Sequence, residues 1–412
     1  MVTSSELRSG GSLIGDVLGE AVRSVREVHQ SVATRVFGAL PPAAEPVRQV
    51  HDAITATAYG ASRAAHTGIP RLGGALAAPL LSPGATSITD TPAGRLAVGA
   101  VNGLWGDRVE RSYAGLAVPM TLRVDGAAVD LTEAGVRRAW PLAGGHLAVF
   151  VHGLCETEHG WGLAARRRHG EPGVTYGSLL ERDLGLTPVF VRYNTGACLT
   201  DSSAALAELL QRLVAVWPAR VEEIVLVGHS MGGLVARGAC HAGAAAGHGW
   251  PEAVRHVFCL GSPHLGARLE RGVEGVAGQL QHVPEARPLA RWLASRSAGV
   301  KDLRHGVCLA AEDRDHDAAT FVRHRAEEMP FLPHASYYFV AATLARDPDH
   351  PSAGLVGDLF VHLPSASGVG EDRHLGFPTD NGAHVGGLTH FGLLNHPAVY
   401  DQLRTWIVRD RG

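Results

Sequence analysis

The chain has 412 residues, of which 45% are hydrophobic and 19% are charged, and its formal net charge is −3. This composition supplies enough apolar side chains for a large buried core, so it excludes an intrinsically disordered chain. The nearly balanced charge excludes a strongly basic nucleic-acid-binding protein, and the short basic run "ARRRHG" (165–170) is typical of a solvated surface.

Cysteine usage and the N-terminal sequence bear on the cellular compartment. Residues 1–20 lack the basic start and apolar core of a signal peptide, and no run approaches the roughly 18 apolar residues of a membrane span. We therefore expect a soluble, cytoplasmic protein, and we leave open a peripheral membrane contact through the N-terminal helices or a lid. Reduced cysteines are expected because they are odd in number and form no C-x-x-C pair: Cys155, Cys198, Cys240, Cys259 and Cys308.

Residues 1–113 are predicted to form a helical region. Two segments have apolar residues three or four positions apart, which indicates two helices, and the prolines of "ALPPAAEP" (39–46) separate them into an antiparallel hairpin. A Gly/Pro-rich stretch follows, and then a short helix over 93–105. We interpret this helical region as a layer that covers the catalytic domain and not as a membrane-surface or partner-binding arm, because the apolar stripe of each helix is narrow and rich in alanine. We call these two stripes the apolar seams. The first consists of Ile14, Leu18, Ala21, Val25, Val28 and Val32, and the second of Val47, Val50, Ile54, Ala58, Ala61 and Ala65.

Residues 114–412 have the pattern of an α/β domain. The runs "MTLRVDG" and "AAVDLT" (120–132) alternate apolar and polar residues and predict an antiparallel hairpin. Five nearly continuous apolar runs follow, with helical segments such as 203–217 between them, and they predict a mainly parallel sheet with helices on both faces. The runs cover 146–153, 188–194, 223–230, 256–263 and 336–344. The long separation at about 267–333 is typical of a helical lid insertion.

The motif "GHSMG" (228–232) lies between a predicted buried strand and a predicted helix. It resembles the G-x-S-x-G nucleophile elbow of the α/β-hydrolase fold, in the bacterial lipase-like serine esterases. Glycines flank the serine in this motif because strand and helix backbones nearly touch at the turn. The resemblance covers about residues 120–408 and implies that Ser230 is the nucleophile of a Ser-His-Asp triad.

The same resemblance places the acid and then the base after the nucleophile. Asp358, with Val361 three residues later, resembles the D-x-x-V acid loop of lipases, and it is preferred over three aspartates in polar turns, Asp347, Asp349 and Asp380. For the base we favour His390, which follows a flexible glycine pair, over His384. His396 precedes a proline and is expected to start a final amphipathic helix, whose buried face would carry Val399, Leu403, Trp406 and Ile407.

Further motifs extend the resemblance to the oxyanion hole and the substrate pocket. The turn "HGL" (152–154) is similar to the H-G-φ turn of lipases, which implies that the backbone N–H groups of Leu154 and Met231 stabilise the oxyanion. "RYNTG" (192–196) and "GSPHLGA" (261–267) also resemble lipase turns. His264 is as well explained by a structural hydrogen bond as by a place in the pocket. The candidate substrate-contacting residues are His152, Gly153, His229, His264 and Leu265.

The chemistry expected from these residues is the cleavage of a carboxylic ester of a small molecule or lipid, without a cofactor. Thioester cleavage or acyl transfer would use the same triad, and a non-catalytic lipid-binding protein of the same fold is the alternative of a different class. We predict no metal site, because the acidic segment "EDRDHD" (312–317) lacks the spacing of a calcium loop and H-E-x-x-H is absent from the sequence. Cys155 is not expected to be a nucleophile. The sequence leaves the oligomeric state open.

Overall fold

The computed structural model of the protein describes residues 3–38, 40–80, 91–266, 297–303, 329–347, 357–370 and 373–412. By its internal contacts the chain divides into two compact units. The first contains the N-terminal helices and both ends of helix α3 (Pro92–Ser112), and the second contains residues 99–107 and the described chain from Val118 onward. Within the described residues, no helix combines the length and the apolar character needed to cross a membrane.

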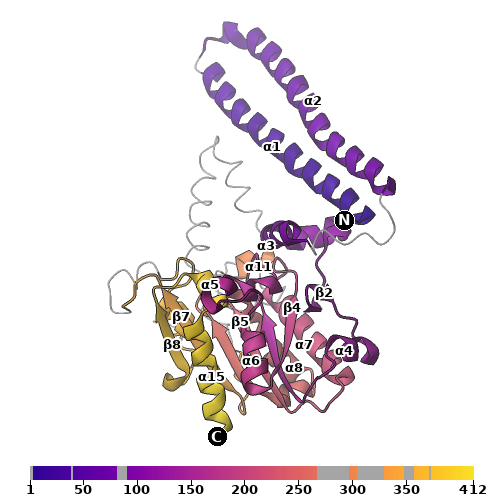
Figure 1. Ribbon diagram of the computed structural model, residues 1–412. Helices are drawn as coiled ribbons and strands as arrows, with labels where there is room; N and C mark the ends of the chain where they lie inside the picture. Colours follow the sequence, from indigo (N-terminus) through magenta and orange to yellow (C-terminus); the bar gives the residue numbers. More distant parts are fainter. Residues whose placement is uncertain are drawn as a thin grey trace. The chain divides into compact units, whose positions relative to one another are not determined.

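Two long helices form the predicted antiparallel hairpin in the first unit, α1 (Ser4–Gly38) and α2 (Glu45–Ala77), joined through the short helix η1 (Pro42–Ala44) (Figure 1). They pack through small residues. A β-carbon added to Gly11 would lie 2.4 Å from the carbonyl oxygen of Pro70, and one added to Gly15 would lie 2.5 Å from that of Thr67. The backbones therefore approach each other as in membrane helix pairs with small residues four positions apart.

The apolar seams of the sequence do not lie in the helix–helix contact. Ile14 is 54% exposed, Val25 57% and Ile54 65%, because the glycine faces take the contact and turn the larger side chains outward. Helix α3 is also longer than the predicted 93–105. Thr91 caps its start by accepting a hydrogen bond from the N–H of Gly94 (3.1 Å), and it continues past a non-helical residue at Trp105. Short helices η2 (Ala78–Leu80) and η4 (Ala114–Leu116) complete this part of the chain.

The described residues of the second unit form an eight-stranded sheet in the order β2-β1-β4-β3-β5-β6-β7-β8. The strands β4, β3, β5, β6, β7 and β8 are parallel to one another, which confirms the predicted, mainly parallel sheet. Strand β1 pairs antiparallel with β2, as the sequence predicts, and also with β4. The strands are β1 (Thr121–Val124), β2 (Ala127–Ala128), β3 (His146–Val151), β4 (Thr187–Arg192), β5 (Glu223–His229), β6 (Val254–Leu260), β7 (Ser336–Thr343) and β8 (Gly382–Gly386). Only the edge strand β8 was not predicted.

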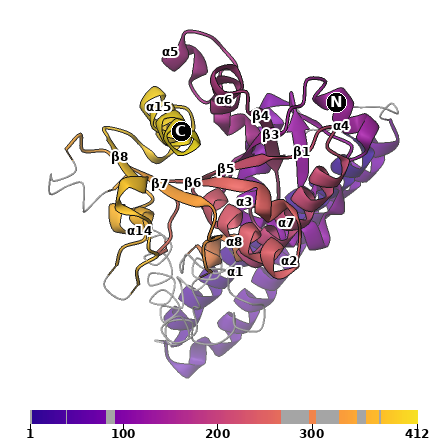
Figure 2. The same cartoon turned by 90° about the horizontal axis from the view of Figure 1, so that it is seen from below.

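Helices cover both faces of this sheet (Figure 2). Helices α6 (Tyr176–Leu184) and α15 (Pro397–Arg411) pack on one face, and α7 (Leu199–Val216) and α8 (Met231–Ala245) pack on the other. His396 caps α15, as predicted, by accepting a hydrogen bond from the N–H of Ala398 (3.2 Å). The shorter helices are α4 (Glu133–Ala139), η5 (Glu158–Gly162), α5 (Ala165–His169), η6 (Trp250–Ala253), α11 (Ala298–Asp302), α14 (Leu363–Ser367), η8 (Thr379–Asn381) and η9 (His390–Leu394).

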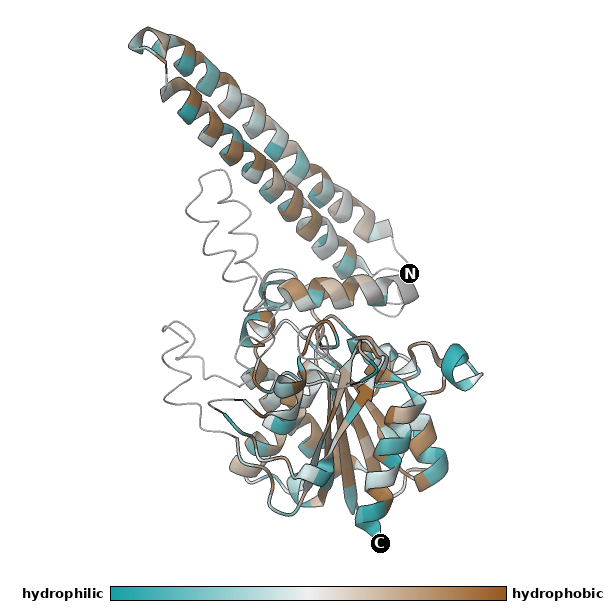
Figure 3. Ribbon diagram, turned by 90° about the vertical axis from the view of Figure 1, so that its left-hand side faces the viewer, coloured by the Kyte–Doolittle hydropathy of each residue, from teal (hydrophilic) through white to brown (hydrophobic). Residues whose placement is uncertain are grey.

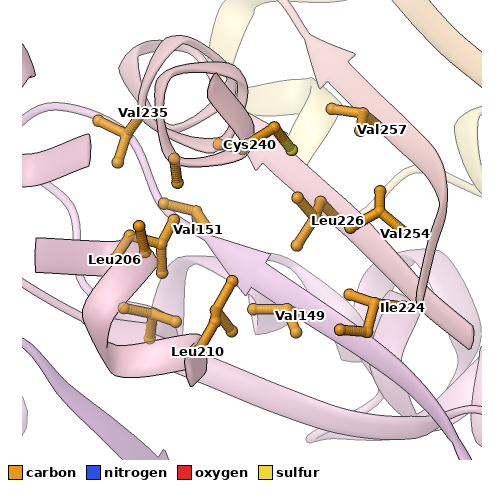
Figure 4. Packing of buried hydrophobic residues seen from close by; sticks show 14 of the residues in the cluster. Val149, Val151, Leu206, Leu210, Ile224, Leu226, Val235, Cys240, Val254 and Val257 are labelled. Atoms are coloured by element: carbon orange, nitrogen blue, oxygen red, sulfur yellow. The ribbon is translucent and has the colours of Figure 1, made fainter. Parts of the chain in front are cut away.

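The core lies between the sheet and these helices. On one face, Val149 and Leu226 of adjacent parallel strands pack against Leu206 and Leu210 of α7 (Figure 4). Figure 3 shows that the strands of the sheet are mainly hydrophobic and that the flanking helices also carry hydrophilic residues. Full burial of one such side chain contributes about 1.5–3 kcal/mol, so the central strands are held rigidly. Most of the predicted lid at about 267–333 lies outside the described residues.

Candidate active site

Ser230 lies on a sharp turn between strand β5 and helix α8. Its φ of 53° and ψ of −122° are rare for a residue with a side chain and cost about 1–3 kcal/mol. Close backbone contacts hold it there, since a β-carbon on Gly228 would lie 2.4 Å from the backbone of Gly233, and one on Gly232 would lie 2.1 Å from the carbonyl oxygen of Val151. The strand–turn–helix context that the motif requires is therefore present.

Asp358 and His390 form a close pair. His390 Nδ1 lies 2.6 Å from Asp358 Oδ2, and the carboxylate is 1% exposed. Asp358 Oδ1 accepts hydrogen bonds from the N–H groups of Phe360 (2.9 Å) and Val361 (2.8 Å). Burial raises the pKa of Asp358, but these bonds and His390 lower it below its usual value. An ionised carboxylate can only accept a hydrogen bond, so Nδ1 of His390 donates in this contact and Nε2 is the ring nitrogen left to act as a base.

The imidazole of His390 lies beside the strand ends that hold Ser230. The N–H of Ser230 donates to the carbonyl of Leu260 (2.7 Å), and a β-carbon on the next residue, Gly261, would lie 3.2 Å from Nδ1 of His390. The ring centroids of His390 and His229, the neighbour of Ser230, are 4.7 Å apart. Among the described residues no hydrogen bond joins Ser230 Oγ to His390 Nε2; such bonds commonly form only when substrate binds.

The other candidate bases have different contacts. His384 lies on the edge strand β8, where its Nε2 is 2.7 Å from Thr343 Oγ1, and burial lowers its pKa. His396 is used as the cap of α15. Of the competing acids, Asp380 lies in η8, where its carbonyl accepts a hydrogen bond from Trp406, and Asp349 lies outside the described residues. Within the part of the chain that the structure describes, His390 is the one of the three histidines that contacts a predicted acid.

The turn after β3 lies against the serine. A β-carbon added to Gly153 would stand 2.9 Å from Ser230 Cβ, so the backbone of residues 153–154 passes directly beside the nucleophile candidate. The N–H of Gly153 donates to Glu156 Oε2 (2.8 Å). The next N–H, of Leu154, and that of Met231 at the start of α8 are the predicted oxyanion donors, and the turn brings their two segments together.

His152 stabilises this turn through its packing and hydrogen bonds. It is fully buried, its Nδ1 donates to the carbonyl of Gly153 (3.0 Å), and its ring packs 4.7 Å from that of Tyr193. Burial lowers its pKa, so the ring is neutral at ordinary pH. The Tyr193 hydroxyl donates to the carbonyl of His152 (2.9 Å), and the neighbouring Arg192 pairs with the buried carboxylate of Glu158. The "RYNTG" turn therefore supports the "HGL" turn.

His264 and Leu265 lie in the turn after β6. His264 is fully buried and accepts a hydrogen bond from Arg237 at Nδ1 (2.9 Å), and burial together with Arg237 and Arg373 holds its pKa well below the usual value. The N–H of Leu265 donates to Ser365 Oγ (3.2 Å). These contacts favour the structural interpretation of His264, while the assignment of both residues to substrate stays a prediction.

Glu156 is the residue of this region that the sequence analysis missed. Its carboxylate lies 2.9 Å from His229 Nδ1, and the signal was present as an acidic residue two positions after the "HGL" turn. Next to it, partial burial and the charge of Glu156 raise the pKa of Cys155 to about 11, so this thiol is protonated at neutral pH and a poor nucleophile. No cluster of three potential metal ligands occurs among the described residues, and the "EDRDHD" segment lies outside them.

Comparisons with known proteins give a family match and distant structural similarities. Residues 191–303 match the family model of the PGAP1-like alpha/beta domain. The mature form of the Bacillus licheniformis lipase BlEst2 is 18% identical with a TM-score of 0.42, and the match covers 64% of this chain and 91% of that one. The Legionella pneumophila phospholipase PlaB is 13% identical with a TM-score of 0.39, over 65% of this chain and 59% of that one. No curated protein matches the chain.

The mainly parallel sheet, the helices on both faces and the family match confirm the predicted fold class. The second unit therefore has an α/β-hydrolase fold, and residues 191–303 of the chain match the model of the PGAP1-like alpha/beta domain.

Proposed function

We propose that this protein is a serine hydrolase that cleaves carboxylic esters, with Ser230 as nucleophile, His390 as base and Asp358 as the acid that orients it. The observation that carries the proposal is the 2.6 Å pair between Asp358 and His390, held beside a serine in a strained elbow conformation. Strained backbone is retained where a function needs it, and a carboxylate–histidine pair beside a serine is what nucleophilic catalysis requires.

The reaction would proceed through an acyl-enzyme. Nε2 of His390 accepts the proton of Ser230 as Oγ attacks the ester carbonyl, and Asp358 stabilises the imidazolium that forms. The N–H groups of Leu154 and Met231 donate to the oxyanion, and each such donor is worth about 10²–10³ in rate. His390 then returns the proton to the leaving alcohol, and a water molecule repeats the sequence to release the acid.

Acyl-chain preference is a separate part of the proposal. The apolar residues that favour a medium or long acyl chain, Val273, Val276, Leu280 and Trp292, fall in the predicted lid and outside the described residues. Thioester hydrolysis and acyl transfer to an alcohol would use the same three residues, so the choice of substrates must separate these reactions.

Steady-state hydrolysis of p-nitrophenyl esters from acetate to laurate tests the proposal, together with an acyl thioester of matched chain length. We expect turnover by the wild type, a preference for butyrate or longer esters, and loss of turnover in Ser230→Ala. Ser262→Ala is the matched control, because this serine is also buried at the end of a neighbouring strand. A folded wild type that cleaves no oxygen ester would overturn ester hydrolysis; cleavage of the thioester alone would keep the nucleophile and change the substrate class.

A further inference from the structure

A second histidine–carboxylate pair lies directly behind Ser230. His229 is fully buried, and its Nδ1 lies 2.9 Å from Glu156 Oε1 and 3.1 Å from Oε2. On the other side of the ring, Nε2 lies 3.1 Å from the carbonyl oxygen of His390. The proposed mechanism uses neither Glu156 nor His229, although both contact segments that carry its reacting groups.

Both ring nitrogens of His229 face atoms that can only accept a hydrogen bond. A backbone carbonyl and a carboxylate have no proton to give, so each contact requires an N–H on the imidazole, and the two together require the imidazolium form. Burial lowers the pKa of His229, but the charge and hydrogen bond of Glu156 and the acceptor carbonyl of His390 outweigh it and raise that pKa. The pKa of Glu156 is lowered, although burial alone would raise it, because of His229 and the Gly153 N–H.

The pair joins three segments of the candidate active site. Glu156 also accepts the N–H of Gly153 at 2.8 Å, which fixes the turn that precedes the Leu154 amide. His229 is the last residue of β5 and positions the elbow. Its bond to the carbonyl of His390 complements the bond from the N–H of His390 to the carbonyl of Asp358 (3.1 Å), so the backbone of the base is held on both sides.

We propose that Glu156 and His229 are positioning residues: as a buried carboxylate–imidazolium pair they hold the oxyanion turn and the backbone of His390 in register with Ser230. This inference rests on the proposed function for its effect on rate, but not for the charge state of the pair. The role differs from the substrate contact that the sequence predicts for His229, because both nitrogens of its ring are bonded to the protein itself.

The pair gives the site a dependence on pH at the alkaline end. When the pH rises through the raised pKa of His229, the ring loses one N–H and one of its two contacts, so the rate should fall there. Removal of the Glu156 charge should move this fall to lower pH. The titratable groups around the pair include Asp358 and His390 near His229, and His152, Cys155 and Tyr193 near Glu156. The ring of Trp161 in η5 packs against the ring of His229.

Two substitutions separate the charge of Glu156 from its place in the packing. Glu156→Gln keeps an acceptor for the Gly153 N–H and removes the charge, whereas Glu156→Ala removes both. We expect kcat to fall modestly in the first and about 10²-fold in the second, the usual size of a small misplacement of catalytic groups, with KM changed far less. Glu171→Gln, on an exposed residue, makes the same chemical change as a control.

Nitrogen NMR of the histidine side chains tests the charge state without any substrate. In a pH titration of the wild type we expect both ring nitrogens of His229 to stay protonated above the usual imidazole pKa of 6.5, and in Glu156→Gln we expect one of them to lose its proton at a lower pH than in the wild type. His229→Phe identifies the signals, and combining it with Glu156→Ala should cost little more in kcat than either change alone, because the two residues act as a unit.

Each result supports or contradicts the inference. A wild-type His229 that loses a ring proton at or below the usual imidazole pKa of 6.5, or a folded Glu156→Ala variant with wild-type kcat and an unchanged alkaline limb of its pH profile, would overturn it. If the wild type itself hydrolyses no ester and no thioester, the proposed function fails, whereas the NMR result still decides the existence of the charged pair.

Discussion

Gly153 and Ser230 are in backbone-to-side-chain contact: a β-carbon on the glycine would lie 2.9 Å from Cβ of the serine. Real β-carbons do not approach that closely, so only glycine lets the turn after β3 pass beside the elbow after β5. This contact sets the position of the predicted oxyanion donor, the N–H of Leu154, relative to the predicted nucleophile Ser230.

Gly153→Ala should reduce kcat/KM about 100-fold, because the added methyl group must push the turn away from Ser230 and misplace the next N–H. The melting temperature should change little, although kcat/KM falls. Gly144→Ala is the control, because this glycine before β3 has open space where a β-carbon would be added. Ester hydrolysis and thermal unfolding of both variants give the answer, and wild-type activity of Gly153→Ala would contradict the placement of the oxyanion turn.

The choice among the three C-terminal histidines is tested by comparing their alanine variants. His390→Ala should lose at least about 10⁴-fold in kcat, whereas His384→Ala should retain most of the activity, because its contact is to Thr343 on the edge strand. His396→Ala should mainly lower stability, through loss of the cap on α15. Asp358→Asn should lower kcat about 10³–10⁴-fold, since a neutral amide cannot stabilise the imidazolium of His390. A larger loss in His384→Ala or His396→Ala than in His390→Ala would reassign the base.

Glu223, at the start of β5, should make stability depend on pH. Burial raises its pKa, but hydrogen bonds from His256, Arg411 and His146 lower it to about 2. Since the folded-state pKa is depressed, its contribution is fully present above the unfolded value near 4.5 and is lost as the pH falls toward 2.

Glu223→Gln should therefore lower the free energy of unfolding by about 1–3 kcal/mol at pH 7, and by less as the pH approaches 2. Glu222→Gln is the matched control. Its side chain is 63% exposed, and its effect should stay within about 0.5 kcal/mol. Urea unfolding at several pH values measures both variants. A deficit of Glu223→Gln that does not shrink with falling pH would mean that its carboxylate is not ionised in the folded protein.

The small-residue contact of the helical hairpin predicts opposite effects for two nearby glycines. Gly15→Ala should destabilise α1 and α2 by about 1–3 kcal/mol, because its β-carbon would meet the Thr67 backbone. Gly10→Ala, on the same helix with open space around it, should stabilise by about 0.5–1 kcal/mol. Calorimetry of the full chain compares the two. Equal effects would mean that the helices pack through another face.

The parts of the fold that the sequence predicts are those with a local physical signal. Strands β3 to β7 are continuous apolar runs because they are buried on both faces, and the elbow needs glycines at fixed positions around Ser230. The preference for Asp358 and His390 came from motif resemblance and position, and the structure brings these two residues together at 2.6 Å.

The remaining features depend on contacts between distant residues. Strand β8, "GAHVG", has no strand pattern of its own and forms only because β7 offers a free edge. The hairpin uses glycine faces that a search for large apolar residues overlooks. Likewise, the pair of Glu156 with His229 joins residues 73 positions apart, so neither residue alone indicates it.

The most direct test of Ser230 as the nucleophile is to map the adduct of a fluorophosphonate probe by mass spectrometry. Trypsin should release residues 221–237, in which Ser230 is the sole serine. We predict that the wild type carries one phosphonyl group on this peptide, that Ser262→Ala is modified equally, and that Ser230→Ala is not modified. An adduct at any other residue, or undiminished labelling of Ser230→Ala, would contradict the assignment of Ser230 as the nucleophile.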